Sequence, residues 1–162
     1  MIVVSNTSPL TNLAAIGRIR LLERLHVQIH IPQAVLDELH ANGRQWPGAA
    51  EVAAAPWIVK HRTEASALTR ALSQHLGPGE SEAIALAVEV KADLILLDDR
   101  DARAAASGLG LKVGGVCGIL LRAKATGEIP SVGPELDRLR GIGFYLTEAT
   151  RRHVLGLAGE SI

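Results

Sequence analysis

The stretch GPGESEAIALAVEVKADLILLDDR, residues 77–100, decides the fold of this chain. The breaker cluster at residues 77–79 can start a helix, and apolar residues then recur at helical spacing over residues 83–88. Leu94–Leu97 form a short continuous apolar run that ends in Asp98 and Asp99, as expected of a strand buried on both faces. In open α/β sheets, ligands bind beyond the carboxyl ends of the strands. The stretch can therefore bring carboxylates from a helix start and from a strand end into one crevice.

Short apolar runs alternate with amphipathic segments on both sides of this stretch. Further strands are expected near residues 2–4, 27–31, 57–59 and 111–113. Further helices are expected over residues 9–17, 19–25, 33–40, 65–76, 102–107, 116–126, 134–140 and 147–157, with a loop at Asn42–Gly43 and a mixed segment around Pro47 and Pro56. Such alternation predicts an α/β fold with a mainly parallel sheet covered by helices on both faces. We expect residues 1–162 to form a single domain.

The composition fits an ordinary globular protein and excludes some classes of function. The formal net charge is zero, which argues against a large nonspecific surface for polyanions but leaves room for a local basic patch. Cys117 is the only cysteine, so no intrachain disulfide can form, as suits a reducing cytosol. The sequence shows no basic segment typical of a signal peptide and no apolar run of about 18 residues that could span a bilayer. We therefore expect a cytoplasmic protein without a membrane segment.

Polar side chains stand where strands end and helices begin. They are Asn6 after the first strand, Glu38 on the helix after the second, Glu80 at a helix start, and Asp98 and Asp99 after the central strand. Three or four oxygen ligands that converge on one crevice suit Mg²⁺ or Mn²⁺. Singly, each could be an ordinary solvated residue, so the prediction depends on their joint placement. We expect the carboxylates of Glu38, Glu80 and Asp98 to lie within reach of one metal ion, with Asn6 at the rim.

Several motifs in the same order resemble those of a known family. They are VVSNTSPL at residues 3–10, IPQAVLDEL at 31–39, GPGESEAIALA at 77–87, LILLDDRDAR at 94–103 and GVCGILLRAKATG at 115–127. Together with Gly143–Phe144, this set resembles a PIN domain, and in particular an uncharacterised PIN-like subgroup related to VapC-type toxin ribonucleases. The resemblance covers nearly the whole chain.

The resemblance implies a three-layer α/β/α fold and a divalent-metal-dependent endoribonuclease. The acidic positions of the family fall on Asn6, Glu38, Glu80 and Asp98, with Glu82 as the other register for the third position and Asp99 and Asp101 near the fourth. Glu38, Glu80 and Asp98 would then be catalytic, and Asp99 a further metal ligand. Most active members have Asp where this chain has Asn6, whose amide oxygen can bind a metal but brings no charge.

The resemblance also implies partners. It points to an RNA substrate, a homodimer and the toxin half of a toxin–antitoxin pair with a small antitoxin protein. The cations near the inferred site that could bind RNA phosphates are Arg100, Arg103, Arg122 and Lys124, although scattered surface cations would look the same. The alternative is a non-catalytic PIN-like module that binds RNA or protein and whose metal site is degraded at Asn6.

Overall fold

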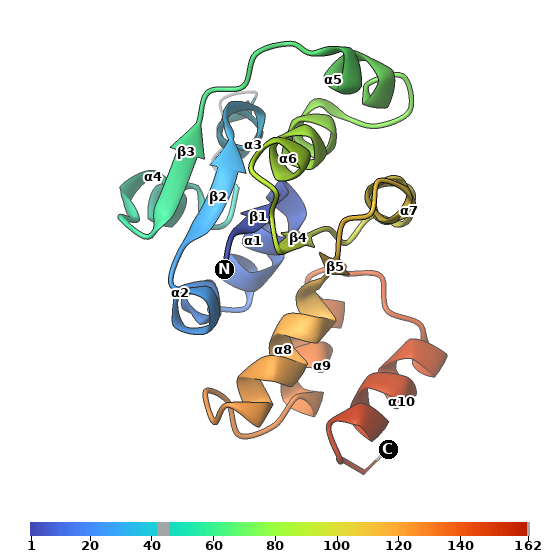
Figure 1. The fold of residues 1–162 in the computed structure, drawn as a ribbon. Helices are drawn as coiled ribbons and strands as arrows, with labels where there is room; N and C mark the ends of the chain where they lie inside the picture. Colours follow the sequence, from blue (N-terminus) through green and yellow to red (C-terminus); the bar gives the residue numbers. More distant parts are fainter. Residues whose placement is uncertain (42–45, 162) are drawn as a thin grey trace.

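The computed structural model describes residues 1–41 and 46–161 and is built on a five-stranded parallel sheet (Figure 1). The strand order is β3-β2-β1-β4-β5, formed by β1 (Val3–Ser5), β2 (Ile29–Pro32), β3 (Ile58–His61), β4 (Leu94–Leu96) and β5 (Val113–Gly114). The helices are α1 (Thr7–Ala15), α2 (Arg20–His26), α3 (Gln33–Leu39), α4 (Ala49–Ala54), α5 (Ala67–Leu72), α6 (Pro78–Glu89), α7 (Arg100–Gly108), α8 (Val116–Ala125), α9 (Gly133–Gly141) and α10 (Glu148–Leu157). The expected α/β fold with a parallel sheet is confirmed. In the described part of the chain, no helix has both the length and the apolar character needed to cross a membrane.

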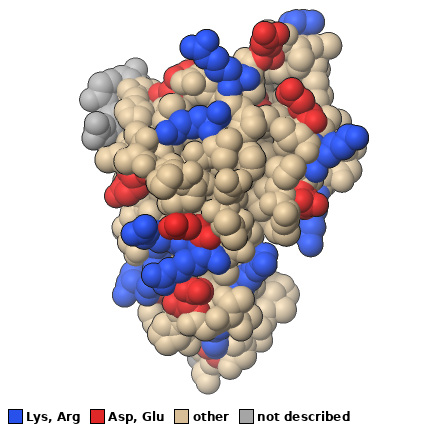
Figure 2. Space-filling model, turned by 60° about the vertical axis from the view of Figure 1, so that its left-hand side comes forward, with Lys and Arg blue, Asp and Glu red and all other residues tan. Residues whose placement is uncertain are grey.

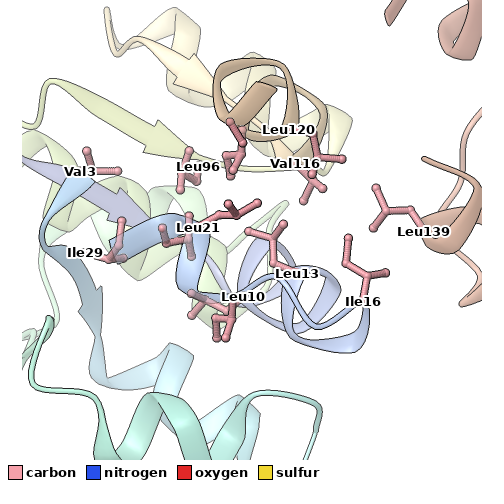
Figure 3. Packing of buried hydrophobic residues seen from close by; sticks show 14 of the residues in the cluster. Val3, Leu10, Leu13, Ile16, Leu21, Ile29, Leu96, Val116, Leu120 and Leu139 are labelled. Carbon is pink, nitrogen blue, oxygen red and sulfur yellow. The ribbon is translucent and has the colours of Figure 1, made fainter. Parts of the chain in front are cut away.

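The sheet is buried on both faces, which gives the fold its three layers. Val3 and Leu96 pack on one face into a large core with α1, α2 and α8, while Val4 and Ile95 pack on the other with α6 and α7. Figure 3 shows the larger core, where side chains of α1 and α8 meet those of β1, β2 and β4. Successive side chains of a strand point to opposite faces, so a continuous apolar run is needed to fill both layers.

The helices α8, α9 and α10 lie together in the C-terminal part of the chain (Figure 1). An ion pair joins α9 to the segment between α1 and α2, because Arg18 Nη2 lies 2.7 Å from Oε1 of Glu135, whose side chain is buried. Glu160 caps α9 by accepting hydrogen bonds from the backbone N–H groups of Val132 and Gly133, at 2.7 and 2.9 Å. It also pairs with Lys124 at 2.9 Å. These contacts fix the N-terminal turn of α9.

Some local expectations were wrong. The segment between Pro47 and Pro56 contains α4, where the sequence AAEVAA has high helix propensity and buries Ala49 and Val52. The first helix begins at Thr7, with Asn6 as its N-cap, rather than at Pro9. Val27 lies outside β2, exposed and at a positive φ of 67°. The loop predicted at Asn42–Gly43 lies outside the described residues.

Candidate active site

A cavity of about 480 Å³ opens at the carboxyl edge of the sheet. Since β1 and β4 are parallel neighbours, the residues that follow them emerge on the same edge. The first turn of α6 and the end of α3 complete the cavity. Its described lining consists of Asn6, Thr7, Ser8, Thr11, Glu38, Ala41, Trp46, Glu80 and Asp99.

Two groups hold the carboxylate of Glu38. Thr7 Oγ1 donates a hydrogen bond of 2.5 Å to Oε2, and the backbone N–H of Gly79 donates one of 2.8 Å to Oε1. A Cβ at position 79 would lie only 2.4 Å from Oε2 of Glu38. The absence of a side chain at Gly79 therefore lets α3 and α6 approach closely enough to fix Glu38.

Glu80 lies one residue further along the first turn of α6 and also lines the cavity. Its Oε2 is buried and has no hydrogen-bond partner among the described residues. Burial raises the pKa of Glu80, and the nearby negative charges of Asp99 and Glu38 raise it further. Glu80 is therefore a carboxyl group that a nearby positive charge would stabilise in its ionised form.

Glu82, the alternative register, faces a different part of the molecule. Its Oε1 accepts a hydrogen bond from the hydroxyl of Thr63 and one of 3.4 Å from the backbone N–H of Ala34 at the start of α3. Residues two apart on a helix lie on nearly opposite faces. The geometry therefore brings Glu80, and not Glu82, to the cavity.

Asn6 is buried, with 5% of its surface exposed, and lines the cavity. Its backbone N–H donates to Leu96 O at 3.1 Å, which fixes it at the joint of β1 and β4. Its side chain makes no capping hydrogen bond to α1, and Oδ1 has no partner among the described residues. Buried polar atoms normally have partners, so an unpaired amide oxygen here is a feature that a bound ligand would explain.

The two aspartates after β4 point in different directions. Asp99 lines the cavity and also caps α7 by accepting from Ala102 N at 2.9 Å. Asp98 does not line it, because its Oδ1 accepts from Val116 N at 3.0 Å at the start of α8. Burial raises the pKa of Asp98, while the hydrogen bond from Val116 and the charge of Arg103 lower it.

The sequence favoured Asp98, but the structure brings Asp99 to the other acids; exposed Asp101 is not part of the lining. A direct role of Asp98 in metal binding stays a prediction.

The acidic side chains at the carboxyl edge do not form a compact cluster among the described residues. Among residues 1–41 and 46–161, no three His, Cys, Asp or Glu side chains lie close enough together to hold a metal ion. That Glu38, Glu80 and Asp98 converge on a bound metal ion stays a prediction. Asp98 is held by Val116, Glu38 is held by Thr7 and Gly79, and clustered carboxylates without a cation repel one another.

The donor chemistry nevertheless fits a hard divalent cation. The cavity combines the carboxylates of Glu38, Glu80 and Asp99 with the amide oxygen of Asn6, and all of these offer oxygen. Asn6 Oδ1 and Glu80 Oε2 are buried without partners in the described structure. A cation would satisfy both atoms and would relieve the repulsion that raises the pKa of Glu80.

The predicted RNA-binding cations are not equally available. Arg103 donates to Leu97 O at 2.7 Å, and Lys124 is bonded to Glu160 and to Ala158 O. Arg122 lines two other cavities, on α8. Arg100 is exposed and directly follows Asp99, so it is the predicted cation next in sequence to a carboxylate of the cavity.

Sequence reasoning missed the neutral part of the site. The hydroxyls of Thr7, Ser8 and Thr11 share one end of α1, and Trp46 provides an aromatic wall that is 46% exposed. Hydroxyls at positions i and i+4 on a helix share a face, which was a usable signal for Thr7 and Thr11. No sequence pattern marked Trp46, which contacts the cavity only through the fold.

Comparisons with known proteins agree with this architecture. A family model described as a PIN domain, DUF3368, matches residues 2–160. A solved structure of a PilT N-terminus domain protein, SSO1118, from the hyperthermophilic archaeon Sulfolobus solfataricus P2 is similar to this chain, with a TM-score of 0.58 and 20% sequence identity. The similarity covers 76% of this chain and 93% of that protein, and at this identity it shows the fold. No curated protein matches the chain significantly.

Proposed function

This chain belongs to the PIN domain family, whose members are generally nucleases, and we propose that it is a divalent-metal-dependent endoribonuclease. One observation carries the proposal. The cavity at the carboxyl edge of the sheet contains three carboxylates and two buried oxygen atoms without partners. Bringing partly buried acids together costs free energy unless a cation compensates them.

The residues that would hold Mg²⁺ or Mn²⁺ are Asn6, Glu38, Glu80 and Asp99. A hard divalent cation bound there supplies positive charge beside the phosphodiester and lowers the pKa of a water molecule. Thr7 and Gly79 keep the carboxylate of Glu38 in one position. Burial and the charges of Asp99 and Glu38 raise the pKa of Glu80, and a bound cation would stabilise its ionised form.

The neutral wall of the cavity supports a single-stranded RNA substrate. Bases that are not paired can stack on exposed aromatic side chains, and Trp46, which is 46% exposed, lines the cavity beside the acids. The hydroxyls of Thr7, Ser8 and Thr11 can hydrogen-bond to sugar or phosphate oxygens. A substrate held by stacking and hydroxyl groups does not require a broad basic surface.

A second candidate is a non-catalytic module that binds RNA or a partner protein. The observation that favours it is Asn6, because a site with three carboxylates and an amide attracts a cation less strongly than one with four carboxylates. This alternative predicts RNA binding without cleavage at any metal concentration.

The biological setting that we propose is a toxin–antitoxin pair. The chain would be the toxin, it would act in the cytoplasm as a homodimer, and a small antitoxin protein would block it. The free cysteine Cys117 suits a reducing compartment. A small open reading frame next to the gene and a dimer mass in light scattering at micromolar concentration would support this setting, and a monomer mass would refute the dimer.

The test of the enzyme is cleavage of labelled single-stranded RNA by the full chain after removal of metals and addition of Mg²⁺ or Mn²⁺. Glu80→Gln and Glu38→Gln should abolish cleavage. The matched control is Glu82→Gln, which lies on the same helix but faces Thr63 and should cleave as the wild type does. Cleavage that survives in both cavity variants would refute the proposal, while RNA binding without cleavage in the wild type would favour the non-catalytic module.

A further inference from the structure

Two adjoining cavities lie away from the carboxylates, between the end of α2 and the side of α8 that faces β4 and β5. The larger, of about 390 Å³, is lined by Met1, Leu25, His26, Val27, Gln28 and Arg122. The smaller, of about 200 Å³, runs beneath α8 along β4 and β5 and shares His26 and Arg122 with the larger one. We call the two together the α8 groove.

The α8 groove contains a buried histidine that the proposed reaction does not use. His26 is 9% exposed, and its Nδ1 has no hydrogen-bond partner among the described residues. Burial and the positive charge of Arg122 both lower its pKa. A neutral imidazole with one free ring nitrogen can donate a hydrogen bond to an oxyanion in the tautomer that carries the proton there.

The charge of the α8 groove has one sign. Arg122 lines both cavities and Lys112 lines the smaller one, and neither forms an ion pair within residues 1–41 and 46–161. No acidic residue is among the described lining of either cavity. Elsewhere the charges are mixed: on the face shown in Figure 2, basic and acidic side chains alternate. The α8 groove is therefore a local site for an anion in a protein of zero net charge.

The α8 groove extends toward the carboxylate cavity. The smaller of its cavities is lined by Lys112 at one end of β5 and by Gly115 at the other. A Cβ at Gly115 would lie 2.8 Å from Oδ1 of Asp98, the residue before Asp99. Gly115 therefore lies beside Asp98, the sequence neighbour of Asp99, whereas Arg122 lies in the last turn of α8.

We propose that the α8 groove binds a backbone phosphate of the RNA outside the cleavage site, through Arg122, Lys112 and Nδ1 of His26. The inference rests on the proposed function and adds a second contact to it. The carboxylate cavity repels a phosphate chain wherever the cation does not screen it, so a cationic contact elsewhere would strengthen RNA binding. Arginine can pair with both non-bridging oxygens of a backbone phosphate at once, and an imidazole N–H can donate a further hydrogen bond to one of them.

The test measures binding of a fluorescein-labelled single-stranded RNA of about twenty nucleotides by anisotropy over a range of salt concentrations. Ca²⁺ replaces Mg²⁺ so that binding is observed without cleavage. Arg122→Ala should weaken binding about five- to tenfold at low salt and reduce the slope of log K against log salt by about 0.7. Lys112→Ala should act in the same direction. The matched control is Arg152→Ala, an exposed arginine of α10 that lines neither cavity and should bind RNA as the wild type does.

The outcomes separate this inference from the proposed function. If the wild type binds and cleaves RNA but Arg122→Ala and Lys112→Ala behave like Arg152→Ala, the α8 groove inference is wrong and the nuclease proposal stands. If inorganic phosphate shifts the NMR signal of the His26 ring while the RNA does not, the α8 groove takes free anions and the inference is also wrong. If the wild type neither binds nor cleaves RNA, both proposals fail. Thermal unfolding of each variant checks that a loss of binding is not a loss of fold.

Discussion

Gly79→Ala should damage the site while leaving the fold intact. The new Cβ would lie 2.4 Å from Oε2, 2.6 Å from Oε1 and 2.7 Å from Cδ of Glu38. Non-bonded heavy atoms pack at about 3.5 Å, so the carboxylate must move by about 1 Å. The backbone angle φ of Gly79 is outside the left-handed region, so the contact with Glu38 is the obstacle.

The movement breaks the hydrogen bonds that hold Glu38. Its carboxylate would leave Gly79 N, now at 2.8 Å, and Thr7 Oγ1, now at 2.5 Å. Hydrogen bonds to a charged group contribute roughly 1.5–3 kcal/mol, while alanine gains up to about 1 kcal/mol over glycine in a helix. Breaking both bonds should therefore lower the free energy of unfolding by about 2–5 kcal/mol, which a domain stable by roughly 5–15 kcal/mol can tolerate. A catalytic group displaced by about 1 Å can cost 100-fold in rate, so RNA cleavage should fall by about that factor.

The assay combines RNA cleavage, calorimetric titration with Mn²⁺ and urea unfolding. Gly156→Ala in α10 is the control, because its added Cβ meets no atom within 4 Å. We expect metal affinity and cleavage to fall in Gly79→Ala alone. Normal metal affinity and normal cleavage in a folded Gly79→Ala protein would refute the argument that the position of Glu38 matters to the site.

Three further predictions concern other parts of the chain. Asn6→Asp should tighten Mg²⁺ binding by roughly 1–2 kcal/mol, about five- to thirtyfold in a calorimetric titration, because it adds a charge to the cavity; coinciding curves would place Asn6 outside the metal shell. Trp46→Ala should weaken single-stranded RNA binding by roughly 1–3 kcal/mol in an anisotropy titration, whereas Trp46→Phe should keep most of the affinity; equal losses would exclude stacking. The hydrogen bonds and the cation around Glu160 lower its pKa from 4.5 to about 2, so its contribution to stability is present above pH 4.5 and is lost as the pH falls toward 2. The melting temperature of Glu160→Gln should therefore lie below that of the wild type at neutral pH and approach it in acid; a difference that does not change with pH would contradict this.

The sequence alone determined the class of fold. Leu94–Leu97 is a run without polar alternation, as expected of a strand covered on both sides. The helices before and after each strand have apolar residues at helical spacing. Local patterns therefore predicted a parallel sheet covered by helices. Helix α4 was missed because prolines flank it, although the helix buries Ala49 and Val52 in the core.

The sequence also placed acids at the carboxyl edge, and the tertiary structure decided which of them meet. Glu80 and Glu82 are both in the first turns of α6. Only the packing of α3 against α6 decides that Glu82 accepts a hydrogen bond from Ala34 N while Glu80 lines the cavity. Asp98 and Asp99 are adjacent, but the start of α8 binds Asp98 and leaves Asp99 in the cavity.

The same holds for Gly79 and for the α8 groove. The need for glycine at position 79 comes from Glu38, 41 residues earlier in the chain, and His26 and Arg122 become neighbours only when α2 and α8 pack on one face of the sheet. Local patterns report the periodicity of a segment, whereas the direction of a side chain and its distant neighbours depend on backbone angles and packing that the whole chain sets together.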